Sequence, residues 1–132
     1  MRFLINGEEG DDIIDDLLQK AETGEITLSI SIAQLLEVYY DRIYVMGIEI
    51  AGEILGSILN GPIKIINTIT HSVLREAARL KTSYAISFAD SIGLATANDL
   101  SIQFITSDGE FKPVEQAENI KFFWFRPPKL KK

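Results

Sequence analysis

Three carboxylates stand alone in apolar or small-residue segments of the sequence and could do chemistry together. Glu37 lies in Leu-Leu-Glu-Val-Tyr-Tyr, Asp90 in Ser-Phe-Ala-Asp-Ser-Ile-Gly, and Asp108 in Ile-Thr-Ser-Asp-Gly. Burying a charge is costly unless something compensates it, so isolated acids in such segments need partners. Three acids that converge could share a divalent cation such as Mg²⁺ or Mn²⁺, because hard cations bind oxygen ligands.

Glu37 is the acid that is hardest to explain by structure alone. Leucine, valine and tyrosine residues surround it, so most of its helix surface is expected to be buried. A carboxylate there would need an arginine, a hydrogen-bond network or a metal ion, since unpaired buried carboxylates are rare. The alternative is that Glu37 lies on the one exposed edge of the helix and pairs with Arg42 or Lys81.

Asp90 and Asp108 each have a structural role that would explain them alone. Asp90 follows Ser87 by three residues, which is the spacing of a capping box at the start of a helix. Asp108 follows an apolar run, where aspartate commonly caps a turn. Thr106 and Ser107 are typical turn residues, although their hydroxyls could also support metal-bound waters or a phosphate. For Asp90 and Asp108 taken singly, a capping role and a catalytic role both stay open. Together with Glu37, the set of three acids favours a shared cation.

Length and composition indicate one globular domain. The 132 residues (14.8 kDa, 46% hydrophobic) are enough for one core and too few for two ordinary domains. We expect a single domain over residues 1–126 and a solvated basic tail over residues 127–132. The chain has no cysteine, no apolar run of about 20 residues and no signal-peptide pattern. These features predict a cytoplasmic protein without a membrane span.

The charge and the missing motifs narrow the chemistry. A net charge of −6 argues against a protein that grips nucleic acid through a basic surface. It does not exclude a metal-dependent nuclease, because the clustered acids of a metal site make the net charge more negative. The bound cations then reverse the sign of the local charge. The sequence has no Gly-x-Ser-x-Gly nucleophile elbow and no glycine-rich phosphate loop.

Hydrophobic periodicity predicts alternating helices and strands. Helices are expected over residues 11–21, 32–46, 49–59, 70–81 and 88–100, and strands over residues 27–31, 63–67, 103–106 and 121–125. The strand over residues 63–67 is expected to be buried, and Leu74, Ala77, Ala78 and Leu80 are expected to face inward. This order is typical of a parallel sheet between two helical layers, whose sites form at the carboxyl ends of the strands.

Taken together, these segments resemble the PIN-domain family, especially the VapC-type toxin ribonucleases of toxin–antitoxin modules. The resemblance spans about residues 7–125 and is carried by residues 7–10 (Gly-Glu-Glu-Gly), 31–40, 86–97 and 106–111. It implies a three-layer α/β/α fold with a parallel five-stranded sheet, RNA cleavage with Mg²⁺ or Mn²⁺, an antitoxin partner and a homodimer. Of the family's four acids, Glu37, Asp90 and Asp108 match the second, third and fourth.

The N-terminus departs from the family pattern, which opens with a strand that ends in aspartate. Residues 1–6 fit two interpretations. The favoured one makes them the tail of the first helix, so that the opening strand and its acid are missing and the sheet is left open. In the other, residues 2–5 form the strand and Asn6 replaces the aspartate. An open sheet would favour swapping or dimerisation.

These observations lead to a hypothesis and a rival. The hypothesis is a metal-dependent endoribonuclease in which Glu37, Asp90 and Asp108 hold the cation that activates a water. The rival is an inactive PIN-like module that binds an antitoxin or a second copy of itself, because the first acid is absent. Its partner surface is expected on the first two helices, around Ile13, Leu17, Ile43 and Ile54. A third possibility is an unrelated small α/β domain.

Overall fold

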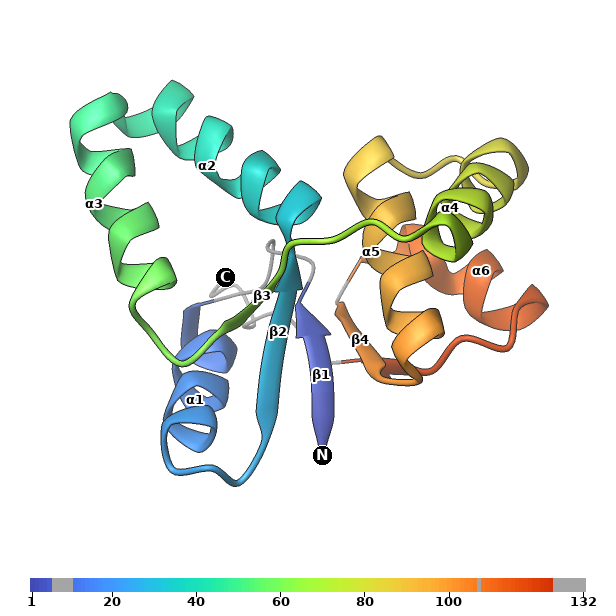
Figure 1. Cartoon of the computed structure of the whole chain (residues 1–132), viewed down its shortest axis with the longest axis horizontal. Helices are drawn as coiled ribbons and strands as arrows, with labels where there is room; N and C mark the ends of the chain where they lie inside the picture. The colour runs from blue at the N-terminus through green and yellow to red at the C-terminus, as the bar shows by residue number, and fades with distance from the viewer. Residues whose placement is uncertain (6–10, 107, 125–132) are drawn as a thin grey trace, which may run out of the picture.

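The computed structural model describes residues 1–5, 11–106 and 108–124, with side chains from residue 15 onward in its first helix. It contains a five-stranded, all-parallel sheet in the order β3-β2-β1-β4-β5 (Figure 1). The strands are β1 (Arg2–Ile5), β2 (Thr27–Ser31), β3 (Lys64–Ile66), β4 (Gln103–Thr106) and β5 (Phe122–Trp124). The helices are α1 (Asp11–Glu22), α2 (Ile32–Met46), α3 (Ile48–Leu59), α4 (His71–Ser83), α5 (Phe88–Leu100), the 3₁₀ turn η1 (Gly109–Phe111) and α6 (Lys112–Ala117).

Two apolar clusters cover the two faces of the sheet. Side chains of a strand alternate between faces, so Phe3 and Ile5 contribute to one cluster and Leu4 to the other. The first cluster includes Leu17 of α1, and the second is filled by α4, α5 and α6. The predicted three-layer α/β/α fold is therefore confirmed. None of the helices in the described ranges is long and apolar enough to cross a membrane.

The favoured interpretation of the N-terminus was wrong. Residues 2–5 are not the tail of a helix but form β1, the central strand, which pairs with β2 and β4. The run Phe-Leu-Ile is too short for its periodicity to separate helix from strand, and it buries alternate residues on both faces. The sheet is consequently complete, and the expectation of swapping from an open sheet has lost its basis. Asn6, like the tail over residues 127–132, lies outside the described residues.

Most other predicted elements are confirmed, and two predictions of burial are wrong. The strand expected over residues 63–67 is β3, which is half-exposed because it lies at the sheet edge and pairs only with β2. In α4 the inward residues are Val73, Ala77 and Leu80, whereas Leu74 is 56% exposed and Ala78 is also exposed. The buried stripe follows the positions i, i+4 and i+7 from Val73.

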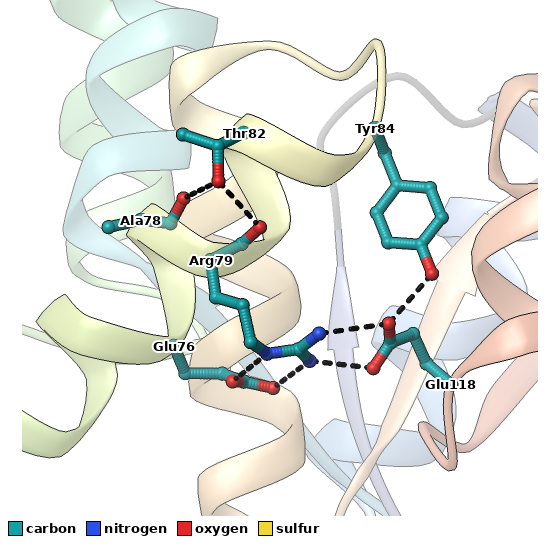
Figure 2. A network of polar contacts seen from close by, with 6 residues as sticks. All are labelled: Glu76, Ala78, Arg79, Thr82, Tyr84 and Glu118. Carbon is teal, nitrogen blue, oxygen red and sulfur yellow. Dashed lines mark hydrogen bonds and ion pairs between the residues drawn. The ribbon is translucent and has the colours of Figure 1, made fainter.

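A polar clamp connects α4 to the segment that follows α6 (Figure 2). Arg79 Nε and Nη2 donate to the two carboxylate oxygens of Glu76, both at 2.8 Å. Its Nη1 and Nη2 donate to Glu118 at 3.1 and 2.6 Å, and the Tyr84 hydroxyl donates to the same carboxylate at 2.7 Å. The hydrogen bonds from Arg79 and then Tyr84 hold the pKa of Glu118 below its ordinary value.

We expect Glu118→Gln to lower the free energy of unfolding at pH 7 by about 1 kcal/mol, the upper range for a solvated ion pair. Because the folded pKa of Glu118 is lowered, its stabilisation is present above the unfolded pKa of about 4.5 and is lost as pH falls through the folded value. Urea denaturation at pH 7 and pH 3 measures both effects. Asp16→Asn, which breaks an exposed pair with Lys20, is the control and should change stability little. A Glu118→Gln loss that is equal at both pH values would contradict the ionic clamp.

Candidate active site

Two of the three predicted acids lie beyond the carboxyl ends of β2 and β4, the strands on either side of the central β1. Glu37 lies in the second turn of α2, which begins directly at the end of β2 (Figure 1). Asp108 follows β4 and precedes η1, and Asp90 lies in the first turn of α5, which packs against α2. In parallel sheets, sites form at this edge because the strand ends and the helix starts meet there.

Ser31 sets the position of α2. It is both the last residue of β2 and the N-cap of α2, so the strand continues into the helix without a loop. The Gln34 backbone N–H donates to Ser31 Oγ at 3.2 Å, which satisfies one of the free N–H groups at the helix start. The direct junction fixes where Glu37 stands relative to the sheet.

Asp90 is the most buried of the three acids, with 9% exposure. Its backbone N–H donates to Ser87 Oγ at 3.0 Å, so the predicted Ser87 cap is confirmed. The pKa of the Asp90 carboxyl is raised to about 6, mainly because the group is buried. A hydrogen bond from the Ser87 hydroxyl lowers this pKa, whereas the negative charges of Glu37 and Asp108 raise it. The charges of Glu37 and Asp108 therefore both reach the Asp90 carboxyl.

Asp108 lies just after β4 and is also the N-cap of η1. Its Oδ1 accepts from the Glu110 N–H at 2.9 Å, which caps η1. Its own N–H donates to Thr106 Oγ1 at 3.0 Å, and Thr106 is fully buried. Thr106 thus holds the Asp108 backbone in place through this hydrogen bond. Ser107 lies outside the described residues.

Glu37 is half-buried rather than enclosed, which corrects one expectation from the sequence. Leu35 is buried, but Leu36 is 61% and Tyr40 is 43% exposed, so much of the apolar surface around Glu37 faces solvent. Its charge reaches Tyr40, whose pKa is raised by desolvation and then by Glu37. Apolar composition alone did not distinguish an exposed apolar face from a core face.

The donor set fits a water-rich cation site rather than an all-protein cage. Among the residues that the structure describes, no group of three or more Asp, Glu, His or Cys side chains is spaced to enclose a metal ion. Mg²⁺ commonly takes one or two carboxylates and keeps several waters. A buried carboxylate whose pKa is raised by burial and by two other acids is a place where such a cation lowers the electrostatic cost.

The structure adds one polar residue that the sequence analysis did not single out. Gln34 is fully buried, and its amide lies where a Cβ at Gly93 would be, 2.4 Å from Oε1. Gly93 is one turn beyond Asp90 on α5. The sequence does show a glutamine among the apolar residues of α2 and a glycine near Asp90 on α5. Only the packing of α2 against α5 shows that the two residues meet.

Comparisons with known proteins place the chain in a family. The PIN domain model matches residues 1–116. The fold is similar to VapBC2 from Rickettsia felis bound to a promoter DNA fragment (TM-score 0.72, 17% identity, 95% of this chain and 99% of that chain). It is also similar to VapC20 from Mycobacterium tuberculosis, described as a Sarcin-Ricin loop cleaving toxin (TM-score 0.64, 17% identity, 86% of this chain and 95% of that chain). A third similar structure is DNA-bound VapBC from Salmonella typhimurium (TM-score 0.69, 10% identity, 93% of this chain and 97% of that chain). No curated protein matches the chain significantly. The chain belongs to the PIN domain family.

Proposed function

We propose that this PIN domain is a metal-dependent endoribonuclease of the toxin type. The observation that carries the proposal is that Asp90 is buried in the first turn of α5, where the charges of Glu37 and Asp108 both reach it. Asp90 is buried, and a buried charge is unfavourable unless an opposite charge or hydrogen bonds compensate it. The similarity to structures of toxin–antitoxin systems, one of them an RNA-loop-cleaving toxin, supports RNA as the substrate.

The roles of the residues follow from their surroundings. A bound Mg²⁺ or Mn²⁺ would lower the pKa of a coordinated water and stabilise charge on the scissile phosphate. Asp90, with a pKa of about 6, is ionised near neutral pH and is the innermost of the ligands we assign. Glu37 and Asp108 would hold the cation from the exposed side. Thr106 fixes Asp108 through its backbone N–H. Ser107 and Asn6 stay predicted supporting residues.

An antitoxin is the partner we propose, because the similar structures include toxin–antitoxin complexes. An apolar groove beside the acids offers it a surface. One part lies between α2, α3 and α5, the other between α4 and α5, and the two parts share Ile69, Phe88 and Ile92. Phe88 is 71% and Leu36 61% exposed, which is unusual for large apolar side chains unless they meet a partner.

This groove replaces the partner surface expected from the sequence. Leu17 is 7% exposed and belongs to the core cluster under α1, so it cannot receive a partner. Ile43 and Ile54 are only partly buried, but Ile54 lies in the contact between α2 and α3. The side chain of Ile13 lies outside the described residues. The homodimer and the cytoplasmic location remain predictions.

Cleavage of a mixed RNA pool by the purified chain with Mn²⁺ tests the enzyme directly. We expect Asp90→Asn to reduce the rate by more than about 100-fold, the upper end of the loss when groups behind a metal ligand are removed. EDTA should abolish cleavage. The control is Asp99→Asn, an exposed acid on the same helix, which should cleave like the wild type. A folded wild-type chain that cleaves no RNA would favour the inactive module.

The same substitution should stabilise the metal-free protein at neutral pH. The folded pKa of Asp90 is raised from 3.8 to about 6, so the folded state loses stability as pH rises between these values. Without metal, we expect Asp90→Asn to raise the free energy of unfolding by about 2 kcal/mol at pH 7.5, after allowance for partial exposure, and by about half as much at pH 5. Urea denaturation with EDTA measures the difference. A variant that is less stable at both pH values would contradict the burial of this charge.

The groove can be tested by co-expressing the chain with a candidate antitoxin, the class of partner that we propose. Phe88→Gln and Leu74→Gln, at exposed positions of the groove, should each weaken the co-expressed complex by at least tenfold, because each removes a large apolar contact. Tyr44→Gln is the control, since Tyr44 is 85% exposed and lies outside the groove. Size-exclusion chromatography with light scattering separates a complex from a homodimer. Equal binding by all variants would place the partner elsewhere.

A further inference from the structure

Gln34 is a buried polar side chain to which the proposed function gives no role. It lies in the first turn of α2 with 0% exposure. The Ser31 hydroxyl donates to Gln34 Oε1 at 3.4 Å, which directs the amide oxygen towards Ser31. Within the described part of the chain, Gln34 Nε2 has no hydrogen-bond partner. A buried N–H group without a partner is unfavourable because it has lost its hydrogen bonds to water, so the fold retains a destabilising group here.

The neighbouring helix leaves room for this amide. A Cβ at Gly93 would lie 2.4 Å from Oε1, 2.5 Å from Cδ and 2.6 Å from Nε2 of Gln34, so any side chain there would displace the amide. Glycine inside a helix is also less favourable than alanine. The contact between α2 and α5 therefore contains two features that each destabilise the fold, the unpaired amide of Gln34 and the helical glycine at position 93.

Asp90 lies one turn before Gly93 on α5, and residues three apart on a helix are neighbours. The Gln34 amide is near enough to lower the pKa of the Asp90 carboxyl, yet it makes no complete hydrogen bond to it. Hydrogen bonds at catalytic sites are often long without ligands and shorten when the site is loaded. The unpaired donor thus has a carboxylate within its reach.

We propose that Gln34 is a positioning residue for Asp90, whose carboxylate it holds through Nε2–H when that carboxylate binds the cation. This inference rests on the proposed function, because it requires a cation at Asp90. Carboxylates that bind metals are usually held by donors behind them, and loss of such a donor weakens binding 10- to 100-fold. Full burial keeps Gln34 away from the RNA.

The test is the affinity of the full-length chain for Mn²⁺, measured by isothermal titration calorimetry. Gln34→Met keeps the length of the side chain and removes the donor. We expect the Kd for Mn²⁺ to rise about tenfold, while the urea midpoint of the metal-free protein stays equal or increases. Unchanged affinity overturns the inference. A loss of affinity that accompanies an equal loss of stability also overturns it, because that pattern indicates a packing role alone.

Gly93→Ala provides an independent variant. It should displace the amide and weaken Mn²⁺ binding to a similar degree, and in a Gln34→Ala background it should add no further loss. Losses that add in full would show that the glycine acts without Gln34 and would overturn the inference. Gln103→Met, at the amino end of β4, is the matched control and should bind Mn²⁺ like the wild type.

The titration separates the cation site from the positioning role of Gln34. If the wild type binds no Mn²⁺ in the titration, the proposed cation site falls and the role of Gln34 falls with it. If the wild type binds Mn²⁺, Asp90→Asn does not, and Gln34→Met binds like the wild type, the cation site stands and only the positioning role is overturned.

Discussion

The burial of α5 on nearly all sides is the constraint on which the rest of the structure depends. Nine consecutive residues, from Ala89 to Ala97, are buried, because α5 packs against α2, α4 and the sheet. Small residues (alanine, glycine, serine and threonine) make up most of this stretch and permit such close approach. Asp90 is part of the buried stretch and cannot move to solvent without moving the helix. Its raised pKa is therefore a consequence of the fold.

At Asp90 and Asp108, the capping hydrogen bonds and the chemical roles that we propose fall on the same residues. The N–H of Asp90 is capped by Ser87, and the carboxylate of Asp108 caps η1. A capping bond fixes the backbone of an acid while a carboxylate oxygen is left for another ligand, so capping and cation binding are compatible. This compatibility explains why the sequence could not separate the two interpretations for either residue. The charges of Glu37 and Asp108 reach Asp90 only through the tertiary structure, which the sequence does not show.

The sequence predicted the elements whose patterns are long and missed features that depend on packing. The bounds of α2 and α5 matched because each runs over more than three helical turns with a cap before it. β1 was misassigned because four residues contain too little periodicity. The inward face of α4 was placed one residue too late, since Leu74 is apolar but exposed. The sequence did not single out Gln34, because its amide packs against Gly93, which lies 59 positions further along the chain.

The groove and the acids share two elements but use different sides of them. Phe88 and Asp90 are two residues apart, so their side chains leave α5 about 200° apart. This geometry agrees with their exposures of 71% and 9%. A partner seated in the groove contacts α5 through Phe88 and Ile92 and does not reach Asp90 through that helix. On α2, however, Leu36 lines the groove and is followed directly by Glu37. A partner that blocks the acids from this groove must therefore extend past Leu36, and Glu37 is the first acid it meets.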